Sequence, residues 1–175
     1  TLVLRECEHF NARLALDALI HYPHLEVFEA RRIVVGDLWS SPQSWACRGL
    51  RRLQVTFESD THDREADTML FEQLSILTRL EEVVVGRGDL SPAGATAGQL
   101  FPRWRLDSGL SFLSNLRRLR YLDVTGTDQG LRLEDVWWMV DNWPSLEKIV
   151  GNFATDPRVN EELKGLARQR GVWVV

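Results

Sequence analysis

Histidine and cysteine side chains are the groups of this chain that could bind a metal or act as nucleophiles. The 175-residue sequence has four histidines and two cysteines. His21 and His24 are three residues apart, but Tyr22 and Pro23 separate them, so no regular helix presents both rings on one side. Cys47 has no second cysteine nearby, and the spacing of a zinc site is therefore missing. We expect no metal site and no cofactor.

An acidic run near residue 60 could bind a cation or supply a general base. It consists of Asp60, His62, Asp63, Glu65 and Asp67. These residues stand beside the start of an expected helix, where carboxylates stabilise the helix dipole. The glycines that follow at 86–98 lack the Gly-Lys-Ser or Gly-Lys-Thr of a phosphate-binding loop, and no Gly-x-Ser-x-Gly motif occurs. We therefore predict that the protein is not an enzyme.

A recurring phrase predicts the elements that would position any site. It reads apolar, two residues, apolar, one residue, apolar. Copies stand at 22–30, 50–55, 80–85, 119–124 and 146–151, with a truncated copy at 2–4. Their alternation and their Val, Ile, Phe and Leu content predict short β-strands. The middle apolar residue of each copy is a register mark: Leu2, Phe28, Leu53, Val83, Leu122 and Ile149. The marks are separated by 26, 25, 30, 39 and 27 residues, and a last strand is expected at 172–175.

In most of the intervals between the expected strands, apolar residues recur at helical spacing. We predict helices over 14–20, 66–77, 110–116 and 133–143, and loops over 35–46 and 86–105. A last helix has an N-cap at Asp156, a proline in its first turn at 157 and a stop at Gly171. Its inner face is expected to hold Val159, Leu163 and Leu166.

Alternation of strand and helix predicts an α/β fold with parallel strands, because the chain must cross back after every strand. Repetition at this period indicates a solenoid, in which each unit buries the apolar face of the next. We expect strands on the concave face and helices on the convex face of one right-handed βα superhelix that spans 1–175.

Leu50–Val55, Leu80–Val85 and Leu119–Val124 resemble leucine-rich repeats, and Leu2–Cys7 resembles the cysteine-containing kind found in F-box and related proteins. Further stretches, at 45–50, 70–80 and 137–146, are similar to the C-terminal repeats of fungal F-box-like proteins. The chain departs from that pattern where Ile33 stands in place of the usual Asn or Cys, in its two long intervals, and in having no visible F-box.

The resemblance implies a single leucine-rich repeat domain of about six repeats, as a fragment of a longer chain. It implies a structural thiol at Cys7, and a role in selecting the protein to be ubiquitinated by an F-box-type ligase. Two cysteines are too few for a disulfide scaffold, which indicates a reducing, intracellular setting, cytoplasmic or nuclear.

Side chains that alternate with the register marks are expected on the concave surface. They carry both charges and one tyrosine, a mixture that suits a protein partner, either a substrate or an adaptor. The predicted partner-binding residues, centred on Arg52, Gln54, Glu82 and Tyr121, are Arg5, Glu29, Arg31, Arg52, Gln54, Thr56, Glu82, Val84, Tyr121, Asp123 and Lys148.

Other partners are less compatible with the composition. A formal net charge of −4 argues against a generic nucleic-acid binder, and no apolar run reaches the length of a membrane span. Two alternatives stay open: a regulator of a small GTPase acting through Arg87 and Arg105, and a purely structural repeat module. In each case we expect a monomer within a larger chain or complex.

Overall fold

The computed structural model describes residues 1–4, 12–40, 43–58, 64–85, 102–125 and 129–175. Seven parallel strands form one sheet in sequence order. They are β1 (Leu2–Val3), β2 (Val27–Val34), β3 (Arg52–Glu58), β4 (Glu82–Val84), β5 (Tyr121–Asp123), β6 (Lys148–Val150) and β7 (Trp173–Val174). The prediction of an α/β fold with parallel strands is confirmed.

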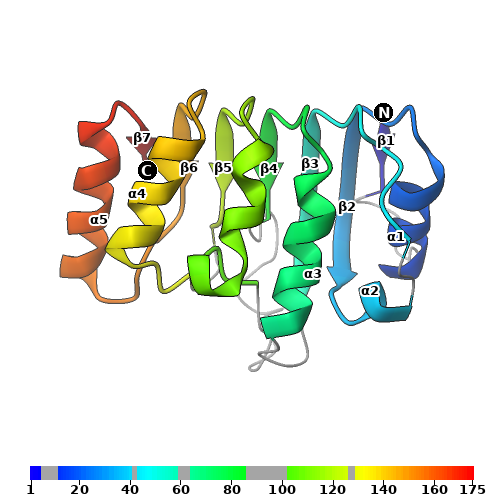
Figure 1. Ribbon diagram of the computed structural model, residues 1–175, viewed down its shortest axis with the longest axis horizontal. Coiled ribbons are helices and arrows are strands. Elements are labelled where there is room, and N and C mark those ends of the chain that lie inside the picture. Colours follow the sequence, from blue (N-terminus) through cyan, green and yellow to red (C-terminus); the bar gives the residue numbers. More distant parts are fainter. Residues whose placement is uncertain (5–11, 41–42, 59–63, 86–101, 126–128) are drawn as a thin grey trace.

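Helical segments connect the strands. They are α1 (Ala12–His21), α2 (Asp37–Ser40), α3 (Arg64–Ser75), the 3₁₀ helices η2 (Leu106–Ser108) and η3 (Leu110–Asn115), α4 (Leu133–Asn142) and α5 (Pro157–Gln169). Figure 1 shows α1, α3, α4 and α5 side by side on one face of the sheet. We call the opposite side of the sheet the open face.

The register marks lie opposite one another across the sheet, as predicted. Leu2 pairs with Phe28, Phe28 with Leu53, and the series continues through Val83, Leu122 and Ile149 to Val174. All of these except Leu2 are buried, and they belong to one hydrophobic core beneath the helices. The core is therefore built from one side chain per strand at the same level.

A turn of constant construction precedes each strand from β2 to β6. The backbone N–H of Leu50 donates to the carbonyl of Cys47, and Leu80 donates in the same way to Leu77. The other three donor and acceptor pairs are Leu25 and Tyr22, Leu119 and Leu116, and Leu146 and Trp143. In the copies at 50–55, 80–85, 119–124 and 146–151, the first apolar residue of the phrase is thus the donor that closes this turn.

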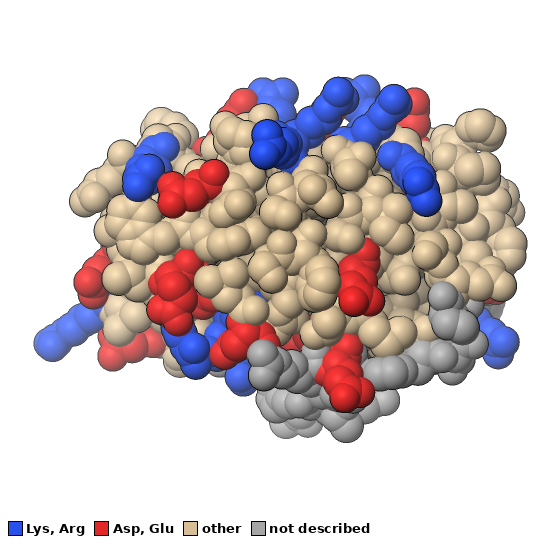
Figure 2. All heavy atoms as spheres, viewed as in Figure 1, with Lys and Arg blue, Asp and Glu red and all other residues tan. Residues whose placement is uncertain are grey.

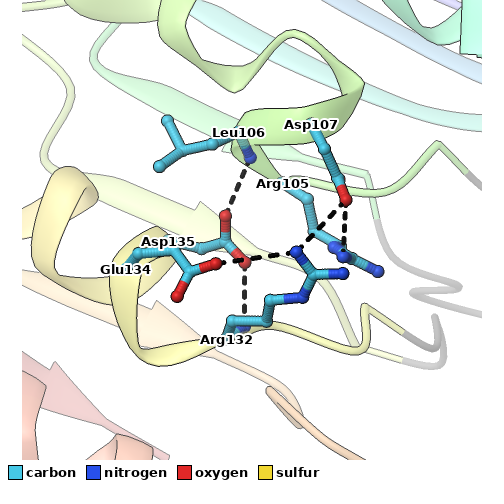
Figure 3. Close-up of polar contacts among 6 residues, drawn as sticks. All are labelled: Arg105, Leu106, Asp107, Arg132, Glu134 and Asp135. Atoms are coloured by element: carbon cyan, nitrogen blue, oxygen red, sulfur yellow. Dashed lines mark hydrogen bonds and ion pairs between the residues drawn. The ribbon is translucent and has the colours of Figure 1, made fainter.

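Each unit consists of a strand and the helical segment that follows it. At the ends of the units away from these turns, buried polar side chains accept backbone hydrogen bonds. Asp135 is buried and accepts from Leu106 N–H and Arg132 N–H, both at 2.8 Å, and so joins η2 to the start of α4 (Figure 3). Asn160 accepts from Phe153 N–H at 2.8 Å in the next unit. These bonds satisfy donors that would otherwise be buried without a partner.

The structure corrects the expected 110–116 helix and the expected 35–46 loop. The first is a 3₁₀ helix, Leu110–Asn115, and the second contains the short helix α2. Gly109 separates η2 from η3 with φ of 105°, and a Cβ there would lie 3.4 Å from the Thr68 Cα. A regular helix cannot run through this left-handed position.

The inner face of α5 also differs from the prediction. Val159 is exposed, whereas Asn160, Leu163 and Lys164 are buried. The Asp156 carboxylate caps the helix as expected, accepting from Arg158 N–H at 2.8 Å. Asn160 takes the inner position because its side-chain oxygen accepts a hydrogen bond from the Phe153 backbone N–H.

Candidate protein interface

The open face carries two rows of side chains that cross the sheet. Arg52, Glu82, Tyr121 and Lys148 lie in register on β3 to β6 and form the first row. The second row lies two residues further along the same strands and consists of Gln54, Val84, Asp123 and Val150. Because the strands are parallel and in register, residues far apart in the sequence become neighbours about 5 Å apart.

These rows line a shallow depression of about 650 Å³. The lining residues are Arg52, Gln54, Glu81, Glu82, Val84, Arg120, Tyr121, Asp123, Glu147 and Lys148. Val84 alone among them is aliphatic. Small-molecule pockets are mostly apolar, so this charged lining is not typical of one, whereas Tyr121 and the arginines are residue types enriched in protein interfaces.

Arg52 is placed between two carboxylates at one end of the depression. Its Nε lies 3.5 Å from a carboxylate oxygen of Glu29 and 3.5 Å from one of Glu82. Its Nη2 donates to the Gln54 side-chain oxygen at 3.5 Å. The buried Nε makes no hydrogen bond with any residue in the described part of the chain. The group of Glu29, Arg52 and Glu82 therefore has one excess negative charge.

Tyr121 occupies the middle of the depression and is held from two sides. Its hydroxyl donates to Asp123 Oδ2 at 3.3 Å, and Lys148 Nζ lies 5.6 Å from the ring centroid. Partial burial, and then the negative charges of Asp123 and Glu82, raise the pKa of the Tyr121 phenol. The ring is thus pre-organised as a neutral, amphipathic contact, the kind that dominates many protein interfaces.

A ladder of ion pairs forms the rim at the N-terminal ends of the strands. Arg51 donates to both carboxylate oxygens of Glu81 at 3.0 Å, and Arg120 donates to Glu147 at 2.7 and 2.9 Å. The hydrogen bonds from Arg51 lower the pKa of the Glu81 carboxyl. Such exposed pairs stabilise the fold little, but they restrain the side chains around the depression.

Seven of the eleven predicted partner-binding residues line the depression: Arg52, Gln54, Glu82, Val84, Tyr121, Asp123 and Lys148. Glu29 adjoins them through Arg52. Thr56 is 6% exposed and is not among the lining residues. Arg5 lies outside the described residues.

Arg31 is displaced by an irregularity in β2. The register shifts between Glu29 and Arg32, so that Arg32, not Arg31, pairs with Thr56. Two residues of β2 there stand opposite one residue of β3, as in a β-bulge. Arg31 is exposed, but it is not level with Thr56, where strict alternation along β2 would have placed it.

Sequence reasoning missed Trp173 on this face. It pairs with Lys148 in the register, which extends the first row onto β7, and it is 75% exposed. Applying the alternation to the expected strand at 172–175, with Val174 as its register mark, would have found it. An exposed tryptophan beside the depression adds a second aromatic contact residue to the row.

The other chemical candidates gain no support from the geometry. Cys47 is buried, and burial raises the pKa of its thiol to about 11, which makes it a poor nucleophile. Arg105 Nη2 pairs with Asp107 Oδ2 at 2.7 Å within the network of Figure 3, and Arg87 lies outside the described residues. In the described ranges, no group of three or more His, Cys, Asp or Glu could hold a metal ion.

Among the helices that the structure describes, none is both long and apolar enough to cross a membrane. Comparisons of the chain with protein-family models, with curated proteins and with solved structures find no match.

Proposed function

We propose that this chain is a non-catalytic scaffold that holds an extended segment of a partner protein against its open face. The observation that carries the proposal is the depression centred on Tyr121, whose charged lining is fixed by contacts along and between the strands. The residues of the first row lie on the backbone of a seven-stranded sheet and not on loops. A partner would therefore bind side chains that are already ordered, which reduces the entropic cost of association.

The first row sets the length of the segment. From Val27 on β2 to Trp173 on β7 it crosses six adjacent strands, a span of about 24 Å, the length of roughly seven extended residues. Tyr121 and Trp173 supply aromatic contacts within that span, and Arg52 supplies a guanidinium. These three residue types are the commonest hot spots of protein interfaces.

The finer architecture and role belong to the same proposal. The repeated turns and the constant register support a leucine-rich repeat solenoid with the open face on its concave side. The resemblance to F-box-like proteins supports substrate recognition for a ubiquitin ligase as the role of that face. The bound segment would then belong to the protein that is to be ubiquitinated.

The proposal is tested with peptides selected on the wild-type protein from a random display library. Their affinities are measured by titration calorimetry for the wild type, for Arg52→Glu combined with Tyr121→Ala, and for a matched control. The control, Arg13→Glu with Tyr22→Ala, changes the same residue types at exposed positions away from the depression.

We expect the open-face variant to lose at least about tenfold in affinity, or ~1.4 kcal/mol, and the control to stay within about twofold. Unchanged affinity of the open-face variant, with both variants folded by circular dichroism, would exclude this face. For the ligase role, the full-length protein should promote ubiquitination of its partner, and the open-face substitutions should abolish that effect.

A further inference from the structure

A second charged surface lies at the edge where the strands begin. The turns before β3, β4 and β5 carry four exposed arginines, Arg48, Arg79, Arg117 and Arg118, which we name the basic edge. Figure 2 shows Lys and Arg side chains gathered along the upper border of the molecule, above the part of Figure 1 where β3 to β5 lie. The three turns share one hydrogen-bonded construction, in which Arg48 and Arg117 are the second residue and Arg79 and Arg118 the third.

The basic edge contrasts with the rest of the chain. The protein has a formal net charge of −4, yet the three central turns contain no acidic residue. The flanking turns of the same construction carry Pro23 and His24 on one side and Pro144 and Ser145 on the other. Positive charge is therefore concentrated on three adjacent units.

The neighbouring carboxylates do not neutralise this edge. Glu81 and Glu147 are engaged by Arg51 and Arg120 in the ladder behind the turns. None of the four arginines of the basic edge forms an ion pair with a residue that the structure describes. After the hydrogen bonds from Arg51, the charge of Arg118 also helps to lower the pKa of the Glu81 carboxyl. The Arg118 guanidinium makes no ion-pair contact there, however, and can still donate hydrogen bonds to an external anion, as can the other three.

We propose that the basic edge binds an acidic segment of a partner protein, a run of aspartate or glutamate residues. Guanidinium groups donate two parallel hydrogen bonds to a carboxylate, a geometry that lysine cannot provide, and all four cations here are arginines. The turns before β3 and β5 are two strands apart, about 10 Å, which an extended run of roughly three acidic residues spans. This surface is separate from the open face, and the proposal does not depend on that site.

A carboxylate-rich segment fits better than a nucleic acid. Proteins that bind single strands place aromatic side chains among the cations for base stacking, and binders of duplexes are strongly basic overall. The three turns, Cys47–Leu50, Leu77–Leu80 and Leu116–Leu119, contain no aromatic residue. The formal net charge of the chain is negative.

The test measures fluorescence anisotropy of a labelled hexaglutamate peptide, with a hexaglutamine peptide as the neutral probe. The variant Arg117→Gln with Arg118→Gln removes two charges from the basic edge. The matched control, Arg13→Gln with Arg158→Gln, removes two exposed charges elsewhere. The open-face variant Arg52→Glu with Tyr121→Ala is measured beside them.

At low salt we expect the basic-edge variant to bind hexaglutamate about tenfold more weakly than the wild type, the control to bind within about twofold, and hexaglutamine not to bind. The open-face variant should bind like the wild type, so failure of one proposal leaves the other standing. Equal losses in the basic-edge variant and the control would overturn the proposal. So would tighter binding of short duplex DNA or of phosphatidylserine vesicles than of the peptide at the same salt.

Discussion

The two faces of the sheet differ although adjacent residues of the same strands form them. On the covered face, Leu53, Val83, Leu122 and Ile149 are at most 1% exposed and pack under the helices. On the open face, their immediate neighbours form a row in which Arg52 pairs with Glu82 and Lys148 lies over the ring of Tyr121. Packing therefore constrains one face closely, while the other is free to vary and can carry recognition.

The largest expected effect comes from truncating one side chain on each face of β5. Leu122→Ala should lower the free energy of unfolding by about 2–5 kcal/mol, because it removes buried contacts and leaves a cavity. Tyr121→Ala, one residue earlier, should cost about 1 kcal/mol or less, because the ring is only partly buried. Urea denaturation measures both, and equal losses would contradict the division between the faces.

The reactivity of the buried Cys47 thiol tests the covered side of this comparison. Burial raises the pKa of Cys47 from 9.0 to about 11, so the thiolate fraction near pH 8 should fall about a hundredfold. In a Cys7→Ser background, we expect slow reaction with a thiol reagent in the folded state and fast reaction in urea. A thiol that reacts equally fast in both states would place Cys47 at the surface.

The same shift has a defined effect on stability. The folded state holds the Cys47 proton more tightly than the unfolded state. The stability that this difference in pKa contributes is therefore complete below about pH 9. It is lost as the pH rises towards 11. A Cys47→Ala variant should therefore show a smaller alkaline loss of stability than the wild type in the same background.

The smallest expected effect concerns Tyr121 on the open face. The substitution Tyr22→Phe leaves Tyr121 as the one tyrosine of the chain, so the ionisation of Tyr121 can be followed by ultraviolet absorbance. We expect a midpoint above the ordinary value of about 10, because burial and Asp123 disfavour the phenolate. Asp123→Asn should lower the midpoint, and an unchanged midpoint would mean that the carboxylate does not act on the ring.

The sequence alone determined the strands and their register, because a buried row requires one apolar side chain per strand at a fixed interval. Leu53, Val83 and Leu122 can be aligned by their spacing along the chain, and the alternation then assigns Arg52, Glu82 and Tyr121 to the other face. The cap at Asp156 was also predictable, since it depends only on residues of the same turn.

The tertiary structure decided the features that depend on contacts between residues distant in sequence. The bulge that displaces Arg31, the inward turn of Asn160 and the link from Asp135 to Leu106 all satisfy backbone groups or register across units. The gathering of four arginines on one edge likewise needed the parallel stacking of three turns. Local periodicity identified the register marks of the strands, but the inward face of α5 and the partner of a buried donor or an exposed charge are set by packing in three dimensions.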